Sequence, residues 1–248
     1  MADNEDIFTF TAPGRLIFPT VTPSQLAEAT KYYDEQVKKG NKRLRAPGWE
    51  VSLMLPMNHP DLPAIDAIIG RLIADNQPNE DVNGNPIGGA AEPLKSGDAL
   101  ANKRKAAIAK LSPPKEPDRE YLRGNLLLVA RSKFPPALAA VINGVMTDLV
   151  TTAQQDAASR MFFMGAEALI QVRFAWYEPT ALAANGGVNA FLNMVAVTGK
   201  GEPLGQAQRS ATSVFKGYAG QVTNADPTRR ATRRTFDERN PPPADGQF

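Results

Sequence analysis

The fold is decided by the stretch Gly165–Gly205, which reads GAEALIQVRFAWYEPTALAANGGVNAFLNMVAVTGKGEPLG. It holds two strand-like runs, Ala168–Tyr177 and Val188–Val197, on either side of a connection that contains proline and glycine. Runs of this kind are typical of a β-hairpin, here one with a long loop. We therefore expect the two runs to pair.

The first run has two different faces, because successive side chains of a strand point to opposite sides. One face is apolar and can fill a core: Ile170, Val172, Phe174 and Trp176. Gln171, Arg173 and Tyr177 lie on the other face. A surface that offers a cation and an aromatic ring suits a single-stranded nucleic acid, whose bases stack on rings and whose phosphates attract cations.

Length and composition are those of an ordinary globular protein. The chain has 248 residues, is 42% hydrophobic and 22% charged, and has a net charge of +2. That charge neither requires nor excludes a nucleic-acid partner, since local patches matter more than the sum. The acidic N-terminus predicts no secretory signal, and no apolar run predicts a membrane span. The absence of cysteine excludes disulfides and thiolate metal sites and is compatible with a reducing cytosol.

Catalytic chemistry has few candidates in this sequence. His59 is the single histidine, and it begins a His-Pro-Asp run that is typical of a helix start. A zinc site would need carboxylates clustered around it, and a Ser-His-Asp triad would need a nucleophile elbow; neither pattern occurs. The glycines of Gly199–Gly205 match no phosphate-binding motif. We expect a protein that is not an enzyme and needs no cofactor.

Alternation, capping and turn residues predict the remaining elements. They are a broken strand at Ile7–Phe18, a helix from Thr22 to Gly40, a strand at Trp49–Leu55, a helix at Asp61–Asn76, a basic and partly helical segment at Leu94–Leu111, a strand at Tyr121–Ser132, and a helix from Pro136 to Ser159.

These elements predict an α+β protein that is mainly β, a five-stranded antiparallel barrel of the OB-fold type. Residues 1–225 would form a single domain, with helical insertions near 22–40, 61–76 and 136–159. Residues 226–248 carry arginines and prolines but almost no aliphatic side chains, so we expect a disordered tail.

The order of the motifs resembles the OB-fold single-stranded DNA-binding proteins that bacteriophages encode in their replication modules. No single motif is diagnostic; their order over residues 7–218 is what resembles the family. The motifs are Gly14–Pro19, Trp49–Pro56, Asp61–Asn76, Pro93–Asp98, Tyr121–Ser132 followed by Phe134-Pro135-Pro136, Gly165–Tyr177 and Gly186–Asn193.

The resemblance implies a non-catalytic protein that coats single-stranded DNA during phage replication or recombination, in the cytoplasm of an infected bacterium. It also implies an acidic C-terminal tail that ends in an aromatic residue, recruits replication proteins such as a polymerase or helicase-primase, and competes with DNA. Phe248 matches the terminal ring. Five arginines at 229–239 depart from the pattern, which leaves open whether the tail inhibits DNA binding or adds to it.

The residues expected to bind DNA are of two kinds. Cations would neutralise phosphates, and rings would stack on bases at about 1–3 kcal/mol each. The cations are Arg131, Lys133, Arg173, Lys42, Arg43 and Arg45, and the rings are Phe134, Tyr177, Trp49, Tyr121 and Phe191. For each ring the alternative is core packing, above all for Trp49 and Trp176, because large rings usually fill cores.

Three other functions remain open at this point. A phage structural or assembly protein on a β-barrel would form stable oligomers and show no salt-dependent DNA binding. An enzyme that acts on nucleotides or peptides is disfavoured by the near absence of histidine and cysteine. A nuclease with carboxylate-bound metal would need neither, but Asp98, Asp148 and Glu167 show no paired spacing. A strand-annealing protein would share the DNA binding and differ in pairing complementary strands.

Overall fold

A computed structural model describes residues 6–41, 45–77, 89–110, 119–179 and 185–204. Contacts within the chain define a first unit that ends at Gly205, and all described residues belong to it. The predicted domain boundary at residue 225 and the predicted tail at 226–248 lie outside the described residues.

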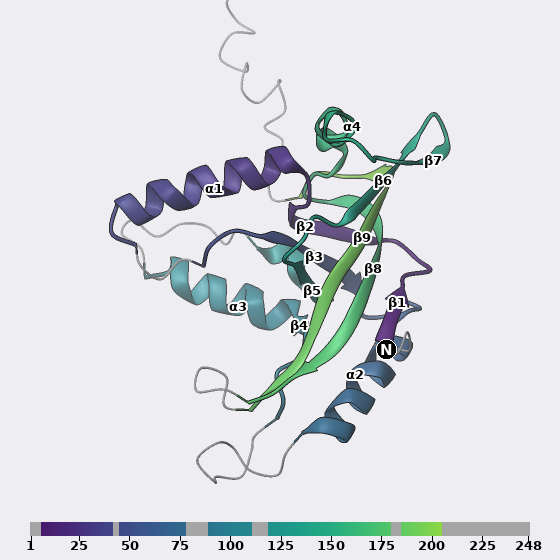
Figure 1. The fold of residues 1–248 in the computed structure, drawn as a ribbon. Helices are drawn as coiled ribbons and strands as arrows, with labels where there is room; N and C mark the ends of the chain where they lie inside the picture. The colour runs from purple at the N-terminus through teal and green to yellow at the C-terminus, as the bar shows by residue number, and fades with distance from the viewer. Residues whose placement is uncertain (1–5, 42–44, 78–88, 111–118, 180–184, 205–248) are drawn as a thin grey trace, which may run out of the picture. The chain divides into compact units, whose positions relative to one another are not determined.

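Five strands close into a barrel (Figure 1). In barrel order they are β2 (Gly14–Thr20), β3 (Trp49–Pro56), β5 (Asn125–Ser132), β9 (Gly187–Gly201) and β8 (Ala166–Tyr177), and β8 pairs back to β2. The pairing of β5 with β9 is parallel, whereas the other four pairings are antiparallel. The five-stranded OB-like barrel predicted from the sequence is confirmed, with one parallel seam.

The barrel interior holds the main hydrophobic core. Alternate residues of β3 and β8 point inward and are almost completely buried: Val51, Leu53, Leu55, Ala168, Ile170, Val172 and Phe174. Helix α2 (Leu62–Asn76) adds Ile65, Ile69 and Leu72 to the same cluster. The predicted alternation of β8 and the helix predicted at Asp61–Asn76 are therefore confirmed.

The start of α2 is held by a small buried polar network. Asp61 accepts hydrogen bonds from the backbone N–H of Thr11 (2.9 Å) and of Ala12 (3.2 Å) and from the Thr11 hydroxyl (2.5 Å), while its own N–H donates to Nδ1 of His59 (3.3 Å). Burial alone would raise the pKa of Asp61, but these hydrogen bonds and nearby His59 lower it. His59 is thus a helix-start residue, as predicted.

Shorter elements cover the outside of the barrel. β1 (Ile7–Thr9) pairs with β8, and β4 (Leu94–Ser96) pairs with β5. Helix α3 (Gly97–Ile108) and the 3-10 turn η2 (Glu120–Leu122) lie over a second small core, made of Ile17, Met54, Leu122 and Leu127 with partly buried Leu100 and Tyr121.

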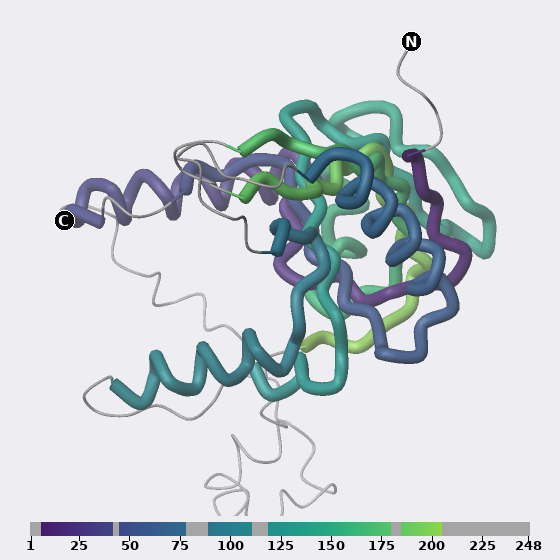
Figure 2. Tube along the Cα trace, turned by 90° about the horizontal axis from the view of Figure 1, so that it is seen from below, coloured from purple at the N-terminus to yellow at the C-terminus, as the bar shows by residue number. Residues whose placement is uncertain are grey.

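Helix α1 (Pro23–Lys38) begins with the predicted capping box. The Thr22 hydroxyl accepts from the Gln25 backbone N–H (3.3 Å), and the Gln25 side chain accepts from the Thr22 N–H (3.2 Å). None of its residues is buried, so the helix adds no side chain to the core. Both α1 and α3 extend from the same side of the barrel (Figures 1 and 2).

The prediction of a helix over 136–159 is wrong. The first half of this range forms a hairpin of β6 (Ala137–Ile142) and β7 (Val145–Asp148). The short helix α4 (Thr152–Ala157) and the 3-10 turn η3 (Ser159–Met161) follow it. Asn143 (φ 52°) and Gly144 (φ 82°) form the turn, and Asn-Gly is the strongest short-range hairpin signal. β6 also pairs in parallel with β9, and Ala139 and Ala140 are buried in the sheet rather than on a helix.

The strand predicted at Tyr121–Ser132 begins later than expected. Tyr121 and Leu122 belong to η2, and β5 starts at Asn125 after Gly124, whose φ of 69° suits glycine. This turn directs Tyr121 into the small outer core instead of along the barrel strand.

Candidate nucleic-acid interface

A row of four side chains crosses the outside of the barrel. The strand register places Glu50 of β3 opposite Arg131 of β5, Arg131 beside Phe191 of β9, and Phe191 opposite Arg173 of β8. Their strand neighbours Val51, Ala130, Ala190 and Phe174 point into the core, so these four lie on the outer face. Neighbouring strands are about 4.8 Å apart, which makes the row continuous.

Two contacts organise this row. The Nε of Arg131 donates to a carboxylate oxygen of Glu50 in an ion pair. The guanidinium of Arg173 lies 5.2 Å from the centre of the Phe191 ring, a cation–π distance. Phe191 is 37% exposed, so the ring is accessible although one cation already contacts it.

A first hollow of about 520 Å³ opens over this part of the barrel. Its walls come from Arg45 in the segment before β3, the segment 91–95, the end of β5, the end of β8 and the start of β9. The lining residues are Arg45, Ala91, Glu92, Pro93, Lys95, Val129, Arg131, Ser132, Lys133, Tyr177, Val188, Asn189, Ala190 and Phe191.

The segment 91–95 is fixed between β5 and β9 by backbone hydrogen bonds. Ala91 donates to the carbonyl of Gly186 (3.1 Å) and accepts from Val188 (2.8 Å), while the carbonyl of Pro93 accepts from Val129 (3.0 Å). These hydrogen bonds fix the segment on the barrel, where it forms one wall of the hollow and Lys95 lines the hollow.

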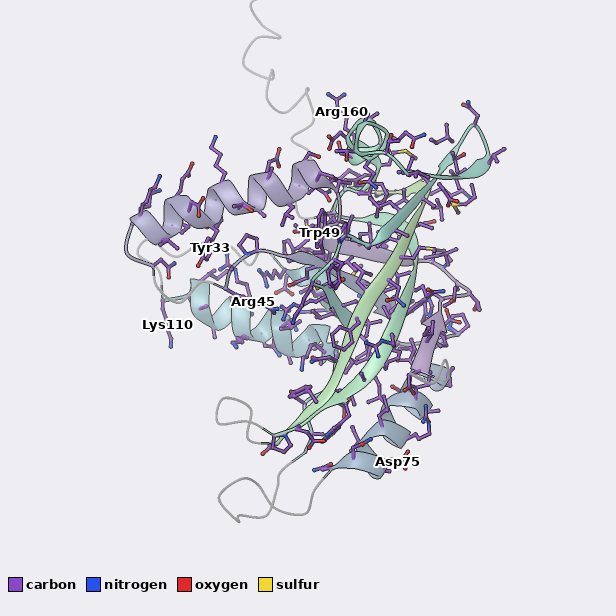
Figure 3. The ribbon with its side chains drawn as sticks, in the orientation of Figure 1. Tyr33, Arg45, Trp49, Asp75, Lys110 and Arg160 are labelled. Atoms are coloured by element: carbon purple, nitrogen blue, oxygen red, sulfur yellow. The ribbon has the colours of Figure 1, made fainter. Side chains whose placement is uncertain are left out.

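A second hollow adjoins the first and shares Arg45, Arg131, Ser132 and Lys133 with it. Its other lining residues are Phe18, Thr20, Leu26, Ala46, Pro47, Gly48, Trp49 and Glu50. Figure 3 shows Arg45 and Trp49 at the side of the barrel from which α1 and α3 extend. We call the two hollows together the barrel groove.

The charges of the barrel groove favour an anionic ligand. Four cations line it, Arg45, Lys95, Arg131 and Lys133, against the carboxylates of Glu50 and Glu92. Burial raises the pKa of Glu50, and the positive charge of Arg45 opposes this only in part. Glu50 therefore takes up a proton more readily than an ordinary glutamate.

Most of the described residues expected to bind DNA meet in this groove. Arg45, Trp49, Arg131, Lys133, Tyr177 and Phe191 line it. Arg173 lies beside it through its contact with Phe191. Lys42, Arg43 and Phe248 lie outside the described residues.

Two expected rings lie elsewhere. Phe134 follows Lys133 and is 76% exposed, but it is not among the lining residues. Tyr121 lines a separate hollow with Arg15, Met54 and Glu167 and packs on the small outer core. The groove therefore does not include them.

The two tryptophans differ in their environments. Trp49 is half-buried at the groove, so it is not a core residue. Trp176 packs against the main core and stacks on Tyr177 with ring centres 6.5 Å apart. Its indole N–H is buried with no hydrogen-bond acceptor among the described residues.

The groove residues that sequence reasoning missed include Phe18, Glu50, Lys95 and Asn189. Strand alternation would have revealed Asn189, which stands between the inward Val188 and Ala190, and Glu50, which precedes the inward Val51. Nothing local marked Lys95, which reaches the groove only through the pairing of segment 91–95. Phe18 was hidden because alternation places it on the same inward face as Leu16.

No group of three or more His, Asp or Glu side chains in the described part of the chain could hold a metal ion. None of the helices described has both the length and the apolar character needed to cross a bilayer.

Comparisons with known proteins gave matches only among solved structures. No protein-family model matches the chain, and no curated protein sequence does. The single-stranded DNA-binding protein from bacteriophage Enc34 in complex with ssDNA is similar with a TM-score of 0.52 at 14% identity, over 81% of this chain and 90% of that one. Its C-terminal truncation gives 0.51 at 15% identity, over 81% and 90%, and the untruncated protein gives 0.50 at 15%, over 86% and 91%.

At identities this low, the structural similarity establishes a common fold and nothing more specific. The resemblance expected from the order of the motifs is thereby confirmed in three dimensions, since the similarity extends over more than four fifths of the chain. This chain has the fold of a bacteriophage single-stranded DNA-binding protein.

Proposed function

We propose that this protein binds single-stranded DNA along the barrel groove, with little dependence on base sequence. The observation that carries the proposal is the outer row in which Arg131, Phe191 and Arg173 occupy neighbouring strands beside a cation-lined hollow. A row that offers cations and a ring together matches the two needs of a single strand, phosphate neutralisation and base stacking.

Different residues of the groove would make the two kinds of contact with the single strand. Lys133, Arg45 and Lys95 are cations on its walls and would face the phosphates. Phe191 and Tyr177 would receive bases on their ring faces. Stacking is tolerant of sequence because every base has a π-face, so no base-specific contact is needed.

The fold neighbour in complex with ssDNA supports single-strand binding by analogy. On the same analogy we propose that the protein coats single strands during phage DNA replication or recombination inside the host cell. Its C-terminal tail, ending in Phe248, would dock replication proteins. We further propose that the protein is not an enzyme and acts by binding alone.

Fluorescence anisotropy with labelled oligo-dT and a matched duplex, across a salt series, tests the proposal. Tight binding to the single strand, weak binding to the duplex and a steep loss with salt are expected. Arg173→Ala and Tyr177→Ala should each weaken the binding. Arg160, an exposed cation that does not line the groove, gives the control Arg160→Ala.

Two results would refute the proposal. One is the absence of single-strand binding at low salt, which would favour an assembly role for this barrel. The other is an equal loss of affinity in Arg160→Ala and Arg173→Ala, which would mean that the charge of the whole surface acts rather than the groove.

A further inference from the structure

Phe18 has an unusual backbone conformation for an aromatic residue. Its φ is 48°, in the left-handed region that a residue with a bulky side chain rarely adopts. It lies where the pairing of β2 with β3 changes register, between Ile17 opposite Ser52 and Thr20 opposite Glu50. Three steps along β2 thus face two steps along β3, which is a β-bulge.

The bulge changes the direction of the Phe18 ring. Leu16 points into the barrel and is fully buried, and strand alternation would send Phe18 the same way. The ring is instead 50% exposed. Bulges that redirect a side chain, and strained residues in general, are concentrated at functional sites.

The redirected ring lies on the wall of the barrel groove. Phe18 lines the second hollow together with Arg45, Arg131 and Lys133. The guanidinium of Arg119 lies 5.1 Å from the centre of the Phe18 ring. This repeats the arrangement at the other end of the groove, where Arg173 lies 5.2 Å from the ring of Phe191.

We propose that Phe18, backed by Arg119, is a second base-stacking platform, so that a single strand runs from Phe191 past Arg131 to Phe18. The proposal rests on the single-strand binding proposed above. β2 and β9 are separated by β3 and β5, which puts the two platforms about 14 Å apart at the usual strand spacing. The cations shared by the two hollows lie between them.

The competing explanation is that Phe18 only packs. It also lines a shallow hollow with Phe162, Phe163 and Met164. If packing were its role, removing the ring would lower stability and leave DNA affinity unchanged. If stacking is its role, the ring is held at the cost of backbone strain, and removing it would spare stability.

Phe18→Gly separates these explanations, because glycine adopts a positive φ without strain. We expect an unfolding midpoint equal to or above that of the wild type and an affinity for oligo-dT lower by about 5- to 100-fold. Phe18→Trp keeps a ring and should keep the affinity. Tyr32, exposed on α1 and outside the groove, provides the control Tyr32→Ala.

The outcomes are distinct. If the wild type does not bind oligo-dT, the proposed function itself fails. If the wild type binds and Phe18→Gly binds equally well, the second platform is refuted. Should Phe18→Gly fold poorly, Phe18→Asn also tolerates the left-handed conformation. Because Trp49 already lines the groove, the deciding signal is then the quenching of Phe18→Trp by oligo-dT beyond that of the wild type, which is absent when bases do not reach position 18.

Discussion

Glu50→Gln is expected to strengthen DNA binding. Glu50 is a carboxylate inside a groove that is proposed to hold phosphates. It forms an ion pair with Arg131, one of the cations that would face those phosphates. A phosphate must therefore displace Glu50 from Arg131 and then remain close to a like charge. Glutamine keeps the size of the side chain and removes both obstacles.

The magnitude follows from the exposure of the pair. The side chains of Arg131 and Glu50 are 45% and 35% exposed, so solvent screens the pair considerably. Ion pairs of this kind are worth about 0.2–1 kcal/mol. Releasing Arg131 should therefore raise the affinity about 1.4- to 5-fold, and less at high salt.

The pH dependence gives a sharper test. Burial raises the pKa of Glu50, with Arg45 opposing only in part. As the pH falls through that raised pKa, Glu50 is protonated, so the wild type loses its competing charge. The affinity of the wild type should then rise toward that of Glu50→Gln, whose own pH profile should be flatter.

Anisotropy titrations of both proteins at low salt, from neutral pH to about pH 5, measure this difference. The ratio of the two affinities should be largest at neutral pH and approach one in acid. Weaker binding by Glu50→Gln at neutral pH would refute the reasoning, because it would mean that Glu50 positions Arg131 for DNA instead of competing for it.

Three further results are expected. Lys133→Ala should reduce the slope of log affinity against log salt by about 1, whereas Arg160→Ala should leave it unchanged in the same titration. Asp61→Asn should lower the free energy of unfolding by about 1–3 kcal/mol in denaturant melts, because the hydrogen bonds from Thr11 weaken. The lowered pKa of Asp61 gives stability that is present above its unfolded pKa and is lost as the pH falls through its folded value, so this difference should shrink in acid. Gly144→Ala should cost about 1 kcal/mol or more, since alanine is strained at φ 82°, and circular dichroism should show no gain of helix.

The failure at 136–159 shows where local patterns were ambiguous. Leu138, Ile142 and Val145 recur at a spacing that suits one face of a helix. The same residues form a hairpin because Asn143-Gly144 makes a tight turn and because β9 provides a partner strand for β6. Each β6 residue pairs with a β9 residue 57 positions further along the chain, so a short window of sequence could not include this partner.

The site was predicted in part for a similar reason. Arg173 and Tyr177 stood out because they alternate with core residues of one strand, which is local information. Lys95 and Phe18 did not stand out in the sequence. Lys95 reaches the groove through backbone hydrogen bonds between segment 91–95 and two distant strands, and Phe18 reaches it through the bulge in the pairing of β2 with β3.

The sequence by itself determined the elements whose cause is local. Alternation defined the strands of the barrel, and the Thr22–Gln25 capping box defined the start of α1. Only the tertiary structure decided the parallel seam of β5 with β9, and with it the placement of Arg131 beside Phe191. Pairings between distant strands depend on which edges remain free after the rest of the chain has folded, and that is a property of the whole barrel.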